Sequence, residues 1–341
     1  MDKIIVSVLL PMFNASSFIE EAVYSILEQT FTFFELIIID DCSTDNSLQI
    51  VENIKDSRII LIKKKQNTGY TDSLNWALKL SRGKYVARMD ADDISLPNRF
   101  KTQVTFLNEN PEVILCGSWF EIIGSSEVIK HPTYHGEISI ALLDYCAIGH
   151  PTVMFRRDEF IKHGLWYDIE MEPAEDHNLW VKAIRIGKLQ NIPKVLLRYR
   201  LHQSQISIKQ KVKQDEYSCT AKRFHLDLLY KSSKPLIDIT APIIFKNIDF
   251  RIQKKYINQY LNELEYLNML NKSLHIFNIK GFEVFCLQKR TFLIKQWFEK
   301  AQSEYLMHLA AFINPSTGYY RYFKNSRKIN LVVRYLNPRK W

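Results

Sequence analysis

Short apolar runs alternate with amphipathic segments along the first part of the chain. Four runs rich in β-branched residues predict strands buried on both faces, at residues 4–10, 36–39, 59–62 and 85–89. Apolar positions at helical spacing between these runs predict helices over residues 19–27, 46–54 and 71–80. This order predicts an α/β fold, in which helices cover both faces of a mostly parallel, Rossmann-like sheet.

Three local signals are expected to set the boundaries of these elements. Pro11 is expected to end the first strand, because proline lacks the N–H that a strand ladder uses. Ser17 and Glu20 have the spacing of a capping box at the start of the first helix. Gly83 stands where a left-handed residue would close the third helix.

Polar side chains gather directly after the predicted strands. These groups are Asn14, Asp40-Asp41, Asn67-Thr68-Gly69 and the segment from Asp90 to Asp93. In open α/β sheets, ligands bind outside the carboxyl ends of the strands. The sequence therefore predicts that the four groups share one site.

The segment after the fourth predicted strand carries three carboxylates, Asp90, Asp92 and Asp93. Carboxylates this close repel one another unless a cation neutralises them, and Mg²⁺ or Mn²⁺ prefers such hard oxygen ligands. The alternative is a solvated acidic turn. The chain has neither the G-x-x-x-x-G-K-[ST] nor the G-x-G-x-x-G motif, so a nucleotide held through a divalent metal is the remaining option.

Several longer segments bear a family likeness. They are VLLPMFN at 8–14, SILEQT at 25–30, FELIIIDDCSTD at 34–45, NTG at 67–69, RGKYVARMDADD at 82–93, GHPTVMF at 149–155, MEPAEDHNLW at 171–180 and RLHQSQIS at 200–207. With these segments, the sequence resembles the family 2 glycosyltransferases, inverting enzymes of the GT-A fold that use nucleotide-sugars. The likeness covers about residues 4–210, and Cys42 departs from it, because the family often has glycine there.

The resemblance implies a set of nucleotide-binding positions. They are Pro11, Phe13, Asn14, Asp40, Asp41, Asn67, Arg88, Asp90, Asp92 and Asp93. Asp41 would accept a hydrogen bond from the base, as from the imide N–H of a uracil. Two of these residues have structural alternatives, since Pro11 could simply break a strand and Phe13 could belong to the core.

The resemblance also implies where the metal and the acceptor bind. Asp92, Asp93 and His202 would hold the Mg²⁺ or Mn²⁺, and Asp176 would be the general base. Glu175 and His150 would lie near the acceptor. The alternatives are that acids at a helix start only complement its dipole, and that His150 is a core histidine.

Composition divides the chain into two parts. Residues 241–341 contain 17 Lys and Arg, 6 Asp and Glu and 19 aromatic residues, a net charge of +11, whereas residues 1–240 carry a net charge of −2. We therefore predict a catalytic domain at 1–215 and a basic, aromatic-rich helical region at 216–341. No run reaches the 18 apolar residues of a membrane span, and no secretory signal is visible. A cytoplasmic protein, peripheral on the inner face of the membrane, is expected.

Together these features predict a glycosyltransferase that moves a hexose or N-acetylhexosamine, in particular from a UDP-sugar, and forms a β linkage. The acceptor would be a glycan or a polyprenyl-diphosphate-linked glycan of bacterial surface-polysaccharide synthesis, and the basic region would contact an anionic membrane. One alternative is a nucleotidyltransferase acting on sugar phosphates, which would release pyrophosphate. Another is nucleic-acid binding by the basic, aromatic tail, although no nucleic-acid-binding motif is present and no such partner is expected.

Overall fold

The computed structural model describes residues 4–203, 205–230, 239 and 250–300. These residues fall into two compact units. Those of the first unit lie within Met1–Ala241 and Leu270–Phe282, and those of the second within Pro242–Met269 and Glu283–Trp341.

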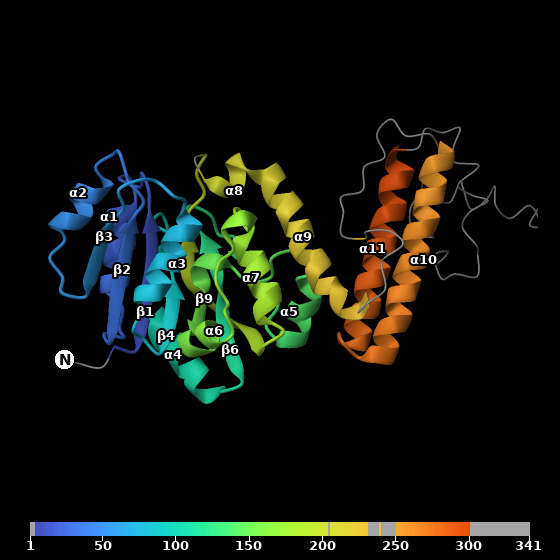
Figure 1. Ribbon diagram of the computed structural model, residues 1–341, viewed down its shortest axis with the longest axis horizontal. Helices are drawn as coiled ribbons and strands as arrows, with labels where there is room; N and C mark the ends of the chain where they lie inside the picture. The colour runs from blue at the N-terminus through green and yellow to red at the C-terminus, as the bar shows by residue number, and fades with distance from the viewer. Residues whose placement is uncertain (1–3, 204, 231–238, 240–249, 301–341) are drawn as a thin grey trace, which may run out of the picture. The chain divides into compact units, whose positions relative to one another are not determined.

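A single mixed sheet forms the centre of the first unit (Figure 1). Its strands are β1 (Val6–Met12), β2 (Phe34–Asp40), β3 (Ile59–Lys63), β4 (Tyr85–Arg88), β5 (Ile94–Ser95), β6 (Val113–Ile122), β7 (Val128–Ile129), β8 (Met154–Arg156) and β9 (Lys188–Tyr199). The order is β3-β2-β1-β4-β8-β6-β9-β5, with β7 paired to β6. The neighbours from β3 to β4 are parallel, as predicted, and β8 runs antiparallel to both β4 and β6.

The helices follow the strands in sequence. Those of the first part are α1 (Ile19–Leu27), α2 (Ser47–Asn53), α3 (Tyr70–Leu80), α4 (Arg99–Glu109), α5 (His135–Ala141), α6 (Arg157–Lys162) and α7 (Glu175–Ala183), with short 3₁₀ turns at His150–Thr152 and Ile169–Met171. Later come α8 (Ile206–Lys209), α9 (Lys211–Tyr230), α10 (Phe250–Leu274) and α11 (Ile279–Lys300).

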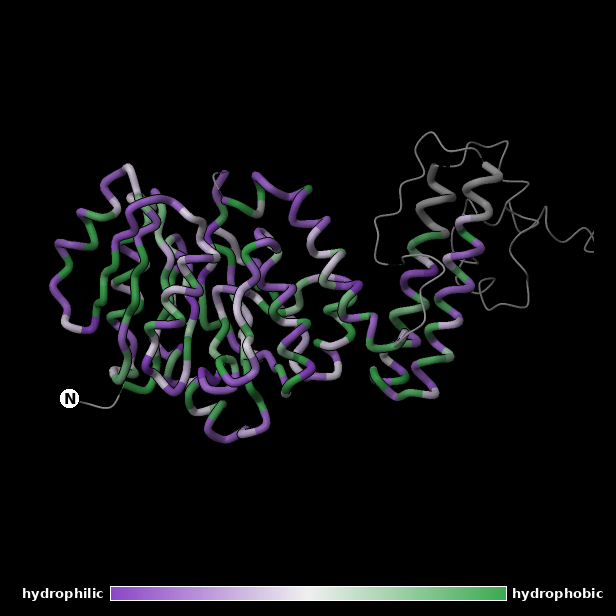
Figure 2. Tube along the Cα trace, viewed as in Figure 1, coloured by the Kyte–Doolittle hydropathy of each residue, from purple (hydrophilic) through white to green (hydrophobic). Residues whose placement is uncertain are grey.

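Alternation of side chains along the strands creates two hydrophobic cores, one on each face of the sheet. Val8 and Leu10 of β1 pack in a cluster with apolar residues of α1, α2 and α4. Leu9 points to the other face and packs with residues of α3 and α7. Figure 2 shows mostly apolar strands and a mixture of polar and apolar residues along the surrounding helices. The predicted layered α/β architecture is confirmed.

The prediction that Pro11 ends the first strand is wrong. Pro11 pairs with Ile39, and β1 continues to Met12. The carbonyl of Leu9 accepts a hydrogen bond from Met89 N, so Pro11, two residues later, also faces the β4 side, where the pairing of β1 stops at Leu9. The missing N–H of Pro11 therefore removes no ladder hydrogen bond.

Two other boundary predictions are also wrong. Helix α1 begins after Phe18, without a capping hydrogen bond from a side chain, and the N–H groups of Phe18 and Ile19 donate to the carbonyl of Ala15 instead. Gly83 does not have a positive φ. Its absent side chain serves close packing, because a Cβ there would lie 2.6 Å from the backbone nitrogen of Ser7.

The C-terminal helices agree in type with the sequence. The described part of the predicted helical region consists mainly of α10, α11 and most of α9. The last part of this predicted region, residues 301–341, lies outside the described residues. Helix α9 contains the predicted domain boundary between residues 215 and 216, so that boundary stays a prediction. Among the described helices, none has the length and apolar character to cross a membrane.

Candidate active site

A cavity of about 590 Å³ lies at the carboxyl ends of β1, β2 and β4 and beside the first turn of α7. Eleven of the residues predicted for the site line it: Pro11, Phe13, Asn14, Asp41, Arg88, Asp90, Asp92, His150, Glu175, Asp176 and His202. Asp40, Asn67 and Asp93 are not part of the lining. Sequence segments far apart in the chain therefore meet in one cavity.

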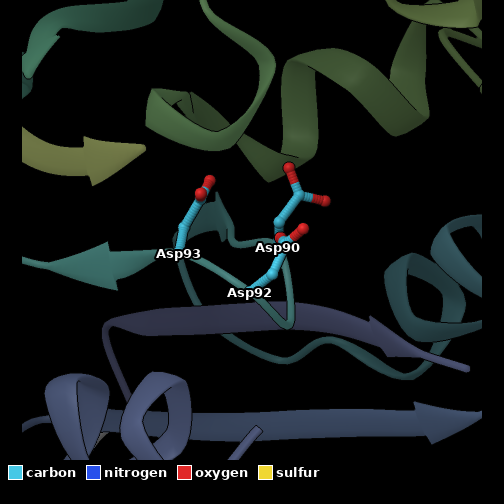
Figure 3. Close-up of side chains that lie close together, drawn as sticks. All are labelled: Asp90, Asp92 and Asp93. Carbon is cyan, nitrogen blue, oxygen red and sulfur yellow. The ribbon is translucent and has the colours of Figure 1, made fainter. Parts of the chain in front are cut away.

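Three carboxylates share the turn after β4 (Figure 3). Oxygen atoms of Asp90, Asp92 and Asp93 all lie within 4.8 Å of one another. Figure 3 shows the three side chains rising from this turn toward the same space. Burial, and then the negative charges of Asp90 and Asp92, raise the pKa of Asp93 well above its usual range. A cation bound here would remove this repulsion.

Asp93 provides the test of whether the cluster fits a metal. Its side chain is fully buried, and Oδ1 accepts a hydrogen bond from Arg200 N at 3.0 Å. Its Oδ2 is buried without a hydrogen-bond partner among the described residues. An unsatisfied buried carboxylate oxygen is costly, and a divalent cation would be a suitable partner for it. The cluster therefore fits Mg²⁺ or Mn²⁺.

Residues after β9 hold the carboxylate turn in place. The Nε2 atom of His202 lies 2.7 Å from Asp92 Oδ2, next to the predicted metal position. Arg200 contributes its backbone N–H to Asp93 and its Nε–H to the carbonyl of Asp92 at 2.8 Å. The guanidinium of Arg200 also forms an ion pair with Glu21 of α1. Arg200 thus positions Asp92 and Asp93, the candidate metal ligands, a role that its sequence pattern did not indicate.

The loop after β1 forms another wall of the cavity. Phe13 is 47% exposed and lines the cavity, so the alternative that it belongs to the core is wrong. Asn14 has a positive φ of 51°, and its Oδ1 accepts a hydrogen bond from Thr44 N at 2.8 Å. This bond joins the loops after β1 and β2. Asp40 is buried behind the residues that line the cavity. Its side chain accepts a hydrogen bond from Ser43 N and so stabilises the loop after β2.

Asp41, the predicted base-binding residue, is buried in a dense network. Its Oδ1 accepts hydrogen bonds from Lys64 Nζ at 2.9 Å and Thr68 N at 3.0 Å. Its Oδ2 accepts one from Gly69 N at 2.8 Å, which leaves one acceptor position for a ligand. The amide oxygen of Asn67 accepts from the same Gly69 N–H, and Asn67 does not line the cavity. Lys64 was not anticipated from the sequence.

Glu175 and Asp176 open α7 and face the cavity. Asp176 accepts a hydrogen bond from His177 N at 2.7 Å, and the thiol of Cys146 donates to its Oδ2 at 3.4 Å. Burial raises the pKa of Asp176. Burial and the adjacent charge of Asp176 raise the pKa of Glu175 to about 8. These shifts favour a proton shared by the pair at neutral pH, and we assign it to Glu175 because burial and the charge of Asp176 both raise the pKa of that carboxyl.

Glu175 is the centre of a buried hydrogen-bond chain. Tyr70 OH donates to Glu175 Oε2 at 2.6 Å, and His150 Nδ1 lies 3.4 Å from Oε1. The other ring nitrogen of His150 lies 3.1 Å from Tyr167 OH. Burial lowers the pKa of His150 well below its ordinary value, so the ring is neutral. Neither Tyr70 nor Tyr167 stood out in the sequence, because a single tyrosine carries no motif.

Comparison with known proteins agrees with this geometry. Residues 7–164 match the family described as Glycosyl transferase family 2. An uncharacterized glycosyltransferase of Haemophilus influenzae is 36% identical over 249 residues, which make up 69% of this chain and 76% of that protein. The chain belongs to glycosyltransferase family 2. A relative of this glycosyltransferase in Escherichia coli is the UDP-Glc:alpha-D-GlcNAc-diphosphoundecaprenol beta-1,3-glucosyltransferase WfgD, 30% identical over 210 residues, covering 61% of this chain and 81% of WfgD.

Solved structures share the fold of this glycosyltransferase. The crystal structure of S. aureus TarS 1–349 in complex with UDP superposes with a TM-score of 0.56 at 17% identity, covering 88% of this chain and 93% of that one. The mannosyltransferase PcManGT from Pyrobaculum calidifontis, in complex with GDP-Man and Mn²⁺, gives a TM-score of 0.52 at 18% identity, covering 97% and 84%. The predicted GT-A fold is confirmed.

Proposed function

We propose that this glycosyltransferase moves a hexose or N-acetylhexosamine from a nucleotide-sugar, in particular a UDP-sugar, to a glycan or polyprenyl-diphosphate-linked acceptor, with inversion at the sugar carbon. The observation that carries the proposal is the cavity, because Asp90 and Asp92 of the carboxylate cluster line it together with the Glu175–Asp176 pair. The donor and acceptor classes follow those in the name of WfgD, which is 30% identical.

The donor side of the cavity is built to receive a diphosphate. Asp90, Asp92 and Asp93, with His202 beside them, would hold the divalent cation. When bound, the cation would stabilise the negative charge of a nucleoside diphosphate leaving group. Arg88 lines the same cavity and is paired with Asp90, which fixes its guanidinium next to the cluster. Asp41, with its remaining acceptor position, would take the base N–H.

The acceptor side requires a base that is ionised when the sugar acceptor arrives. With the shared proton on Glu175, Asp176 carries the charge, and the nearby positive charge of Arg88 stabilises this ionised form. Among the described residues, Oδ1 of Asp176 accepts from His177 N and Oδ2 accepts from the Cys146 thiol, and a carboxylate has further lone pairs to which an acceptor hydroxyl could donate. Asp176 would then take the hydroxyl proton as that oxygen attacks the sugar carbon.

A donor screen tests the proposal. Purified protein is incubated with a panel of UDP- and GDP-sugars, Mg²⁺ or Mn²⁺, and N-acetylglucosamine diphosphate carrying an alkyl chain as acceptor. We expect free nucleoside diphosphate, and a β-linked product from an α-linked donor by NMR. Release of pyrophosphate would favour the nucleotidyltransferase alternative, and a product that keeps the donor configuration would contradict inversion.

We also propose that the basic C-terminal region attaches the enzyme peripherally to the inner face of the cytoplasmic membrane. Among the described residues, exposed apolar side chains occur on α10 and α11, at Tyr266, Met269, Val284, Leu287 and Phe292. Basic residues accompany them along the same helices, including Lys272 and Lys280. Apolar and cationic side chains together are the combination that binds an anionic bilayer surface.

A further inference from the structure

Four aromatic rings form a row that leads away from the cavity. Their centroids are separated by 5.4 Å between Tyr199 and Phe120, 5.8 Å between Phe120 and His131, and 6.2 Å between His131 and Tyr145. Tyr199 and Phe120 line the cavity, and Tyr145 is 45% exposed. The aromatic row, defined as these four residues, therefore connects the site to the protein surface.

The aromatic row is held by the fold. Phe120 belongs to β6 and Tyr199 to β9, which are paired strands. The indole N–H of Trp119 donates to the backbone carbonyl of His131 at 3.0 Å, which anchors the backbone that carries the third ring. A Cβ at Gly149 would lie 3.0 Å from the Phe120 ring, so glycine there leaves room for that ring. The row is consequently formed before any ligand arrives.

The chemistry of the row suits a neutral sugar. Burial lowers the pKa of His131 to about 4, so this ring is uncharged at neutral pH and adds no charge to the row. The C–H face of a pyranose is apolar and packs on aromatic rings, while its hydroxyls stay at the edges. A diphosphate, by contrast, needs cationic groups or a metal, which the row does not supply. The donor side of the cavity already provides those.

The row also lies next to the proposed base. Cys146, whose thiol donates to Asp176 Oδ2 at 3.4 Å, directly follows Tyr145 in the chain. A sugar resting on the row would therefore approach the cavity from the side of Asp176. We propose that the aromatic row is a stacking platform that binds a saccharide of the acceptor. This inference rests on the proposed function, because it assigns the row to the acceptor of that transfer.

The rival occupant is the lipid chain of a polyprenyl-linked acceptor. The row carries polar groups at its edges, since Tyr199 OH accepts a hydrogen bond from Gln205 Nε2 at 3.3 Å and His131 contributes its ring nitrogens. Such edges match the hydroxyls of a sugar better than the methyl and methylene groups of an isoprenoid. Testing the sugar and the lipid separately distinguishes the two.

The test measures binding without turnover, by saturation-transfer NMR on the full chain with UDP and Mg²⁺. The probes are the methyl glycosides of N-acetylglucosamine, glucose, galactose and mannose, which lack a lipid, and undecyl phosphate, which lacks a sugar. We expect saturable binding of at least one glycoside. Tyr145→Ala should weaken it about five-fold or more, and Tyr145→Phe, which keeps the ring, should retain it.

Tyr24→Ala is the matched control, because Tyr24 is 44% exposed on α1 and does not line the cavity. This variant should bind the glycoside like the wild-type protein. Equal glycoside binding by Tyr145→Ala, binding of undecyl phosphate alone, or no glycoside binding by the wild type would overturn the platform. None of these results affects the donor screen, so the two proposals can fail independently.

Discussion

At the scale of single residues, the neighbouring carboxyls Glu175 and Asp176 differ in their surroundings. Glu175 is only 2% exposed and its two oxygens face Tyr70 and His150, both neutral groups. Asp176 is partly exposed in the cavity and accepts two hydrogen bonds. Environments that separate the proton affinities of a carboxyl pair also separate their roles. These surroundings favour the proton on Glu175, which would leave Asp176 free to act as the base that we propose.

This assignment predicts a pH dependence of stability. Because the pKa of Glu175 is about 8 in the folded protein and near 4.5 in an unfolded chain, the folded state binds the extra proton between these values. Stability from this group is therefore present below about pH 4.5 and is lost as the pH rises toward 8. Glu175→Gln removes the titration.

Thermal unfolding at pH 5 and pH 8, in a chelator, measures the effect. The wild type should lose more of its melting temperature between the two values than Glu175→Gln does. Glu28→Gln, on an exposed residue at the end of α1, is the control and should follow the wild type. Parallel curves for wild type and Glu175→Gln would show that Glu175 keeps no proton at neutral pH.

At the scale of elements, the turn after β4 carries a destabilising cluster of carboxylates, and a bound divalent cation would relieve their repulsion. Asp93 is buried with one unsatisfied oxygen and two further carboxylates nearby. In Asp93→Asn the like-charge repulsion is relieved, so in a chelator this variant should melt higher than the wild type, by about 2–4 °C for each kcal/mol gained. Mn²⁺ should raise the melting temperature of the wild type but not of Asp93→Asn.

Activity provides the second half of this prediction. Asp93→Asn should transfer sugar far more slowly than the wild type, and a chelator should have the same effect on the wild type. Asp158→Asn, at an 88% exposed side chain, is the control for both measurements. Full activity of the wild type in a chelator would assign charge stabilisation to a cationic side chain instead.

The elements also show what a sequence can reveal. Strands and helices up to β4 follow from apolar periodicity, because both faces of this sheet are buried and the pattern is strong. The prediction that Pro11 ends the strand fails because the effect of a proline depends on the side to which its nitrogen faces. Only the pairing of the strands determines that side. The prediction of a left-handed Gly83 fails for a related reason. The glycine is needed for close packing against Ser7 of β1, which is distant in sequence.

The residues of the candidate site likewise fall into two groups, those that the sequence indicates and those that only the fold brings together. Asp90, Asp92 and Asp93 were found because they are adjacent in the chain, and the resemblance to a family supplied Glu175, Asp176 and His150. Tyr70, Cys146 and Tyr167 contact that second group from three separate segments. No local pattern marks such residues, since only the tertiary fold brings them together.

At the scale of the whole molecule, the uneven charge predicts membrane binding. Each Lys or Arg near an anionic surface contributes about 1 kcal/mol, and residues 241–341 carry a net charge of +11. In flotation assays the full chain should bind vesicles of phosphatidylglycerol, which is anionic, and this binding should weaken at high salt. The chain should not bind vesicles of phosphatidylcholine, which carries no net charge. Truncation after residue 240 should abolish binding. Equal binding to both vesicles, or to neither, would make the region a structural module.

The central claim is that Asp176 is the base of an inverting transfer, and the variant Asp176→Asn tests it most directly. The substitution nearly preserves shape but removes the group that takes the acceptor proton. We predict that kcat falls roughly 100-fold or more while the dissociation constant of the donor, measured by calorimetry, stays within about two-fold of the wild type. Loss of donor binding with little change in kcat would place Asp176 in the nucleotide site and contradict the account.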